Sequence, residues 1–260
     1  MDLLPQPNKE TVEKIRNMAG VDEQRVKEAV KMLTEWLQLQ PHLPHHYDEA
    51  RMERLFLRCK TSIERAKQTL DMYFTIKTAL PEIFSNRDPL QPWFIQASSV
   101  RCFIPLPQLT EEYDRVSLLT CIDPDPDKYI VFDIMKMMAM VLEIRCNEDY
   151  HMSDILLVDF NNLTIGHVVK YTLPVLKKLE VTAVKAYKAR VKGVHFINAP
   201  TFVDTTVQLF KSLLSPKLSK RIYIHRKGSN TLSQYVSPKI LPYDYGGNAG
   251  SIHDLWVPSS

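Results

Sequence analysis

The sequence predicts an α/β protein in which a small N-terminal helical bundle precedes a domain built on a mainly parallel sheet. Apolar residues in the first eighty positions recur at helical spacing, whereas short β-branched runs beyond residue 90 alternate with longer helix-like segments. Between these two regions, residues 86–92 are rich in turn-forming residues. We therefore expect a helical domain over residues 1–85, a second domain over residues 90–250 and a C-terminal tail over residues 251–260.

Caps and prolines delimit the expected helices of the first domain. Asp22 and Ser62 are placed to cap two of them, and Pro41 and Pro81 follow their ends. We expect four helices in this domain, over residues 9–19, 22–40, 48–59 and 62–80.

The second domain shows the alternation typical of parallel sheets. Strands are expected over residues 116–122, 154–160, 194–198 and 221–225. Helices are expected over residues 129–146, 167–188 and 200–214. Strands that alternate with helices of this length favour βαβ units.

Two of these helical segments have an unusual composition. Four methionines lie within residues 135–140, and such a flexible wall suits an irregular ligand, although methionine also fills ordinary cores. On a helical wheel, the apolar residues of segment 202–214 span an arc of roughly 160°, against the ~100° that docking on a core requires. The surplus suits a cavity or a membrane interface, and deep burial is the alternative.

Positive charge is concentrated in one part of the chain. Residues 160–228 contain thirteen Lys and Arg against two acidic residues, a net charge of +11, and the remainder of the chain carries −8. This asymmetry favours a surface that meets lipid headgroups or nucleic acid. The alternative is that these lysines cover solvated helix faces.

Motifs for catalysis or metal binding are missing from the sequence. There is no nucleophile elbow, no Gly-rich phosphate loop and no dinucleotide fingerprint. His42, His45 and His46 lack a cysteine partner, and the prolines around Asp125 indicate a solvated turn. We therefore expect no enzyme, no cofactor and no metal site.

The sequence also bears on the compartment. It has no apolar run near the ~20 residues of a membrane span and no signal-like start. Its four cysteines form no Cys-x-x-Cys pair, which is typical of free thiols in a reducing compartment. We expect a cytosolic monomer.

Five blocks of sequence, in order, resemble the CRAL-TRIO family. The most recognisable is a strand that ends in Asn198-Ala199-Pro200. As a set the blocks are specific and cover most of the chain. They are Leu55–Ala66, Ile155–Leu163, Val191–Pro200, Leu213–Ile222 and Leu241–Gly247.

The resemblance implies one lipid held in an apolar pocket beneath a mobile gate helix, which matches segment 202–214 here. It is strongest to the branch that carries tocopherol and retinaldehyde, although Tyr187-Lys188 replaces the usual Tyr-Pro and Asn161-Asn162 replaces a basic-Gly turn. We expect the pocket and gate to comprise Met135, Met138, Val158, Phe160, Ile197, Phe202, Val203, Val207, Phe210 and Leu214.

In that branch a basic cleft beside the gate recognises phosphoinositide headgroups. The matching positions here are all basic, and they suit phosphate because several cations can converge on its oxygens. The alternative is surface charge, with the first of these residues joining the two domains. The positions are Arg58, Arg190, Lys192, Lys217 and Arg221.

The sequence therefore predicts an intracellular carrier that binds a tocopherol-, retinoid- or isoprenoid-like lipid and releases it at membranes with the help of phosphoinositides. Its contact with anionic membranes would be peripheral and transient. The alternative is a phosphoinositide-sensing adaptor that does not transfer cargo. Nucleic-acid binding is not expected, because the basic block lacks a recognition motif.

Overall fold

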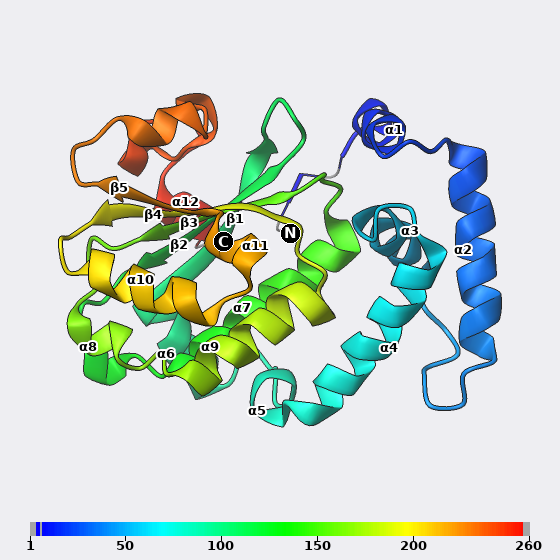
Figure 1. Cartoon of the computed structure of the whole chain (residues 1–260), viewed down its shortest axis with the longest axis horizontal. Helices are drawn as coiled ribbons and strands as arrows, with labels where there is room; N and C mark the ends of the chain where they lie inside the picture. The colour runs from blue at the N-terminus through cyan, green and yellow to red at the C-terminus, as the bar shows by residue number, and fades with distance from the viewer. Residues whose placement is uncertain (1–3, 6, 257–260) are drawn as a thin grey trace.

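The computed structural model describes residues 4–5 and 7–256, except for the side chains of Thr206, Leu209, Phe210, Ser212 and Leu213. The helical region lies at one end of the molecule and the sheet at the other (Figure 1). The elements of the first region are α1 (Lys9–Met18), α2 (Glu23–Gln38), α3 (Glu49–Arg58), α4 (Ile63–Ala79) and α5 (Pro81–Phe84). Helix α6 (Pro92–Val100) follows and lies beside the sheet.

Side-chain caps begin the first four helices. Asn8, Asp22, Asp48 and Ser62 each accept a hydrogen bond from the backbone N–H three residues ahead, which satisfies a donor that the helix leaves free. Apolar faces of α2, α3 and α4 then pack into one buried cluster that includes Leu33. The four expected helices are thus present, with the caps at Asp22 and Ser62 as the sequence predicts.

The sheet has the order β1-β2-β3-β4-β5, and only the β1–β2 pair is antiparallel. This confirms the α/β class and the mainly parallel sheet. The strands are β1 (Arg101–Leu109), β2 (Arg115–Cys121), β3 (Asp154–Asp159), β4 (Val191–Ala199) and β5 (Ile222–Arg226). Strand β1 was not expected from the sequence, because Pro105 and Pro107 interrupt it. It lies at the edge of the sheet, where proline is tolerated.

Helices cover one face of the sheet (Figure 1). They are α7 (Val131–Glu148), α8 (Ile165–Val168), α9 (Leu173–Glu180), α10 (Val203–Leu213) and α11 (Pro216–Ser219), together with α6. The single helix expected over residues 167–188 is instead broken. It comprises α8, then α9 with Pro174 in its first turn, and then a π-helical turn over Val181–Ala186.

The C-terminal segment covers the opposite face of the sheet. Its short helical turns and α12 (Ile252–Trp256) pack against β1, and the Trp256 Nε1–H donates to the Ser98 carbonyl at 3.1 Å. Part of the expected tail is therefore helical. Close packing also requires Gly247, since a Cβ there would lie 1.9 Å from the Leu241 carbonyl oxygen.

Candidate binding cavity

A cavity of about 250 Å³ lies between the sheet and helices α7, α8 and α9. Because side chains alternate along a strand, the strands contribute residues spaced two apart, such as Arg101 and Phe103 of β1. Phe103, Leu119, Val158 and Phe196 supply much of the sheet side. Most of the lining residues are apolar. The cavity is therefore suited to an apolar molecule.

Most of the predicted pocket residues lie at or beside this cavity. Met135, Met138, Val158, Phe160 and Leu214 line it. Phe202, just before α10, and Val203 and Val207 of α10 pack into the same apolar cluster as Phe160. The side chain of Phe210 lies outside the described residues.

The expectation for Ile197 is corrected by the structure. Ile197 follows Phe196 on β4, so its side chain points to the other face of the sheet, where it packs with Leu157 and Ile240. Val194 and Phe196, which sequence reasoning missed, line the cavity instead. The period-two alternation along β4 was the signal that could have found them.

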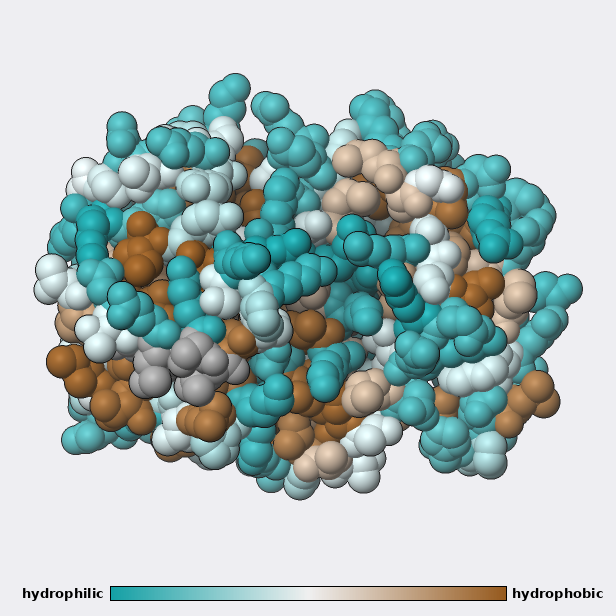
Figure 2. Space-filling model, in the orientation of Figure 1, coloured by the Kyte–Doolittle hydropathy of each residue, from teal (hydrophilic) through white to brown (hydrophobic). Residues whose placement is uncertain are grey.

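An exposed apolar patch was also missed. Ile165, Val169 and Leu173 are 58%, 65% and 54% exposed, and they lie at α8 and the start of α9. Figure 2 shows apolar side chains gathered over α8, on the face that also carries α10. Their i, i+4, i+8 spacing predicts one helix face packed on the core, but the break after α8 turns these residues outward.

The structure brings four of the five predicted basic residues to the amino-terminal ends of β4 and β5. Arg190 immediately precedes β4, Lys192 lies at its start and pairs with Asp114, and Lys217 is exposed on α11. Arg221 precedes β5 and donates to the Val191 carbonyl. These four residues, with the neighbouring exposed Lys220, are called the basic edge below.

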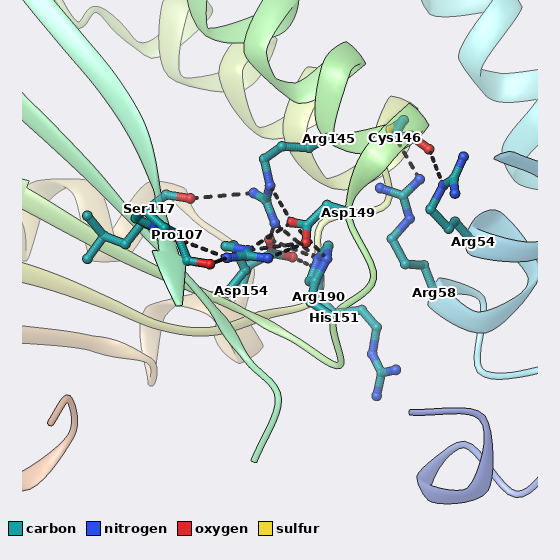
Figure 3. A network of polar contacts seen from close by, with 12 residues as sticks. Arg54, Arg58, Pro107, Ser117, Arg145, Cys146, Asp149, His151, Asp154 and Arg190 are labelled. Carbon is teal, nitrogen blue, oxygen red and sulfur yellow. Dashed lines mark hydrogen bonds and ion pairs between the residues drawn. The ribbon is translucent and has the colours of Figure 1, made fainter. Parts of the chain in front are cut away.

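Arg58 is placed differently. Its side chain is 8% exposed, and its Nη2 donates to Cys146 Sγ at 3.1 Å, at the end of α7. Arg54 next to it donates to the Cys146 carbonyl at 2.9 Å. Figure 3 shows both side chains reaching from α3 toward Cys146, so Arg58 joins the helical region to α7. A headgroup contact by Arg58 stays a prediction.

A buried ionic network closes the cavity at the amino ends of the parallel strands. Arg145 donates to Asp149 at 3.0 Å and to Asp154 at 2.7 Å, and Arg115 donates to the second oxygen of Asp149 at 2.8 Å. Burial disfavours both carboxylate ions, but the opposing charges of Arg145 and His151 outweigh it and hold the pKa of each aspartate below its usual range. Every one of these side chains thus has a charged partner (Figure 3).

The cavity has a second polar region at the carboxyl ends of the strands. Arg101, at the start of β1, pairs in register with Cys121 at the end of β2, and its side chain lines the cavity. Beside it, His167 and Tyr171 also line the cavity, and Tyr171 Oη lies 2.5 Å from Tyr129 Oη. Apolar side chains separate this region from Arg145 and Asp154.

Other chemistry is not assembled among the residues that the structure describes. No group of three or more His, Cys, Asp or Glu side chains could hold a metal ion there. Within the same residues, no helix is long and apolar enough to cross a membrane. All four cysteines are buried free thiols.

Comparisons with known proteins place this fold in a family. Residues 102–247 match the model of the CRAL/TRIO domain, and residues 22–94 match that of a Pinta-like UBA domain. The human protein named "Alpha-tocopherol transfer protein-like" is 25% identical over 217 residues, which are 82% of this chain and 62% of that protein. Human clavesin-2 is 25% identical over 206 residues, covering 78% of this chain and 58% of the relative.

The chain thus spans about three fifths of the length of these relatives. A solved structure has the same fold. The crystal structure of Sfh5 superposes with a TM-score of 0.58 at 14% identity and covers 92% of this chain and 93% of that one. Because the family model matches more than half of its residues, this chain belongs to the CRAL/TRIO family of lipid-binding and transfer proteins.

Proposed function

We propose that the protein encloses one apolar lipid in the cavity and transfers it, chemically unchanged, between membranes. The observation that carries this proposal is the cavity, whose wall is made mostly of apolar side chains from five strands and the helices above them. Burying a lipid tail there again removes it from water, at about 25 cal/mol per Å² of apolar surface. Transfer of the lipid from the bilayer interior to the cavity, both of which are apolar, is then close to neutral in free energy.

Access to the cavity would come through α10. Leu214 and Leu218, at the end of α10 and on α11, line the cavity, so a displacement of this segment would open it. The exposed patch of Ile165, Val169 and Leu173 lies on the same face and would enter the interface of the bilayer. A tocopherol-, retinoid- or isoprenoid-like lipid is the cargo class that the similarity to tocopherol-transfer-like proteins supports.

The basic edge would hold this face against an anionic leaflet. Lys217 and Lys220 are exposed, and a lysine near an anionic surface contributes ~1 kcal/mol of binding. Phosphoinositide headgroups offer several negative charges, to which clustered Lys and Arg can bind together. Contact with the membrane would be peripheral and transient.

The experiment that tests the carrier function is mass spectrometry of the lipids that the purified protein retains. The protein is incubated with a tissue lipid extract, repurified and extracted with organic solvent. We expect one apolar species at about one molecule per chain, which agrees with a single cavity. No enrichment over an unrelated control protein would contradict cargo carriage and would favour a phosphoinositide-sensing adaptor.

A double charge reversal tests the membrane contact. Lys217→Glu with Lys220→Glu should weaken binding to phosphatidylcholine vesicles containing phosphatidylinositol bisphosphate about tenfold or more, because two attractive charges become repulsive. The retained lipid should stay in place. Cosedimentation measures the binding, and Lys27→Glu with Lys31→Glu is the matched control, since both lysines are exposed on α2 away from this face. Equal vesicle binding by the two double variants would refute the assignment.

A further inference from the structure

Among the residues that the structure describes, no carboxylate forms an ion pair with the buried side chain of Arg101. Its side chain is 2% exposed, yet its Nε and Nη1 have no hydrogen-bond partner. The groups that interact with it most strongly are Tyr129, Tyr171, Cys121 and Cys102, which are neutral phenols and thiols at pH 7. Because arginine stays protonated in proteins, the charge persists inside the cavity wall. Such a charge is unfavourable unless an anion accompanies it.

Contact with Tyr129 holds this guanidinium but does not satisfy its hydrogens. The Arg101 Cζ lies 5.6 Å from the centre of the Tyr129 ring, a cation–π distance. A cation–π contact involves the charge and the ring face, and it provides no acceptor for the free N–H groups. Arg101 lines the cavity, so an occupant with an acceptor group can supply the partners that these buried N–H groups lack.

The neighbouring polar groups are also hydrogen-bond donors. His167 is 1% exposed, and its Nδ1 accepts from the Thr164 backbone N–H at 3.1 Å, which leaves the ring proton on Nε2. This Nε2 lies 3.9 Å from Cys121 Sγ, a long contact that a carboxylate can replace. Burial and the charge of Arg101 lower the His167 pKa, so the imidazole ring is neutral at pH 7. Of the two bonded hydroxyls of Tyr129 and Tyr171, one donates to the other, and the second hydroxyl proton is free.

An acceptor group with negative charge therefore fits this end of the cavity. We propose that the lipid bound here carries a carboxylate, that Arg101 binds this carboxylate, and that His167 and Tyr171 add hydrogen bonds. The tail lies along the apolar wall toward Arg145. The inference rests on the proposed carrier function and narrows its cargo class to lipids with a carboxylate head, such as a long-chain or isoprenoid-like acid, which excludes tocopherol itself.

The other charges on the wall do not compete for the head. Arg145 is already bonded to Asp149 and Asp154, and the negative charge of Asp154 would repel a carboxylate. The basic edge lies at the amino ends of the strands, opposite the end where Arg101 lies. Two anionic sites thus have different positions, an internal one for the cargo head and an external one for the membrane.

The test compares a fluorescent polyunsaturated acid, cis-parinaric acid, with its methyl ester. We expect the wild-type protein to bind the acid roughly ten- to a hundredfold more tightly than the ester, because only the acid can form a charge-assisted hydrogen bond with Arg101. Arg101→Met should bind the two with equal affinity, at the level of the wild-type ester. Arg101→Lys, which keeps the charge, should retain part of the preference.

The outcomes separate this inference from the carrier function. Equal wild-type affinities, or a preference for the acid that persists in Arg101→Met, would overturn the role of Arg101 and leave the carrier function in place. If the wild-type protein binds neither probe and retains no tissue lipid, both proposals fail. The wild-type comparison requires no variant, so it decides the question even if Arg101→Met does not fold.

Discussion

Two arginines on the wall of one cavity have opposite surroundings. Arg145 and Arg101 are 3% and 2% exposed, and both line the cavity, at opposite ends of the parallel strands. Arg145 is bonded to Asp149 and Asp154, whereas no carboxylate is among the groups that interact most strongly with Arg101. The two arginines are equally buried, but only the charge of Arg145 is balanced by carboxylates, which indicates that they have different roles. The charge of Arg145 stabilises the fold through ion pairs, and that of Arg101 is available to a ligand.

The position of each arginine agrees with this difference. Arg145 lies in the last turn of α7, and its carboxylate partners hold the connection from α7 to the start of β3. Arg190 contributes to the same connection through its backbone N–H, which donates to Asp154 at 2.8 Å, while its side chain points away from the network (Figure 3). Arg101 begins an edge strand and joins no comparable connection.

The largest expected effect is on folding stability. Arg145→Met would leave Asp149 and Asp154 buried with one cation fewer, at a cost of about 3–5 kcal/mol in the free energy of unfolding. Arg101→Met replaces an uncompensated cation by an apolar side chain, so we expect the delipidated variant to be as stable as the wild type or more so. Urea denaturation of both delipidated variants measures the two changes.

Equal losses in the two variants would contradict the comparison, because Arg101 would then be structural as well. Unfolding should also be followed with the long-chain acid present. The acid should stabilise the wild type and leave Arg101→Met less affected, since a ligand stabilises only the state that binds it.

The sequence predicted the architecture better than it predicted the cavity. Alternation of β-branched runs and helices predicts parallel strands wherever a strand is continuous, which is why β2 to β5 were found and β1, with its two prolines, was not. The caps at Asp22 and Ser62 were identified because they depend on residues close in sequence. Ile197 was assigned to the wrong face because apolarity was used where alternation decides the direction of a side chain.

Arg101 could not have been recognised as a site from sequence. A single arginine is ordinarily exposed, and only the tertiary structure shows that Arg101 is buried with two nitrogens lacking a hydrogen-bond partner. The basic block was visible as a charge asymmetry, but its division into an exposed edge and residues bonded to the backbone, such as Arg221, depends on strand pairing. A count of charges along the sequence predicts that a basic surface exists. The hydrogen-bond partners of each Lys or Arg in the fold determine which of these charges remain free.

A smaller effect, on pH dependence, sharpens the same comparison. Asp154 has a pKa below its usual value because the charges of Arg145 and His151 outweigh its burial. A carboxylate with a lowered folded-state pKa contributes stability above its unfolded pKa of about 3.9, and this contribution is lost as the pH falls. Between about pH 5 and pH 3, the wild type should lose about 1 kcal/mol more unfolding free energy than Asp154→Asn.

The difference between the two proteins measures this contribution together with that of His151, whose pKa Asp154 helps to raise. His195, whose pKa burial and His225 lower to about 4, also destabilises the protein as the pH falls from about 6.5, but it does so equally in both. Arg101 is not among the groups that mainly lower the Asp154 pKa, so Arg101→Met should keep the loss that Asp154 causes and differ from the wild type only through His167, whose pKa the charge of Arg101 lowers. Parallel profiles for wild type and Asp154→Asn would show that Arg145 is not compensated as the distances indicate, and the contrast with Arg101 would then lose its basis.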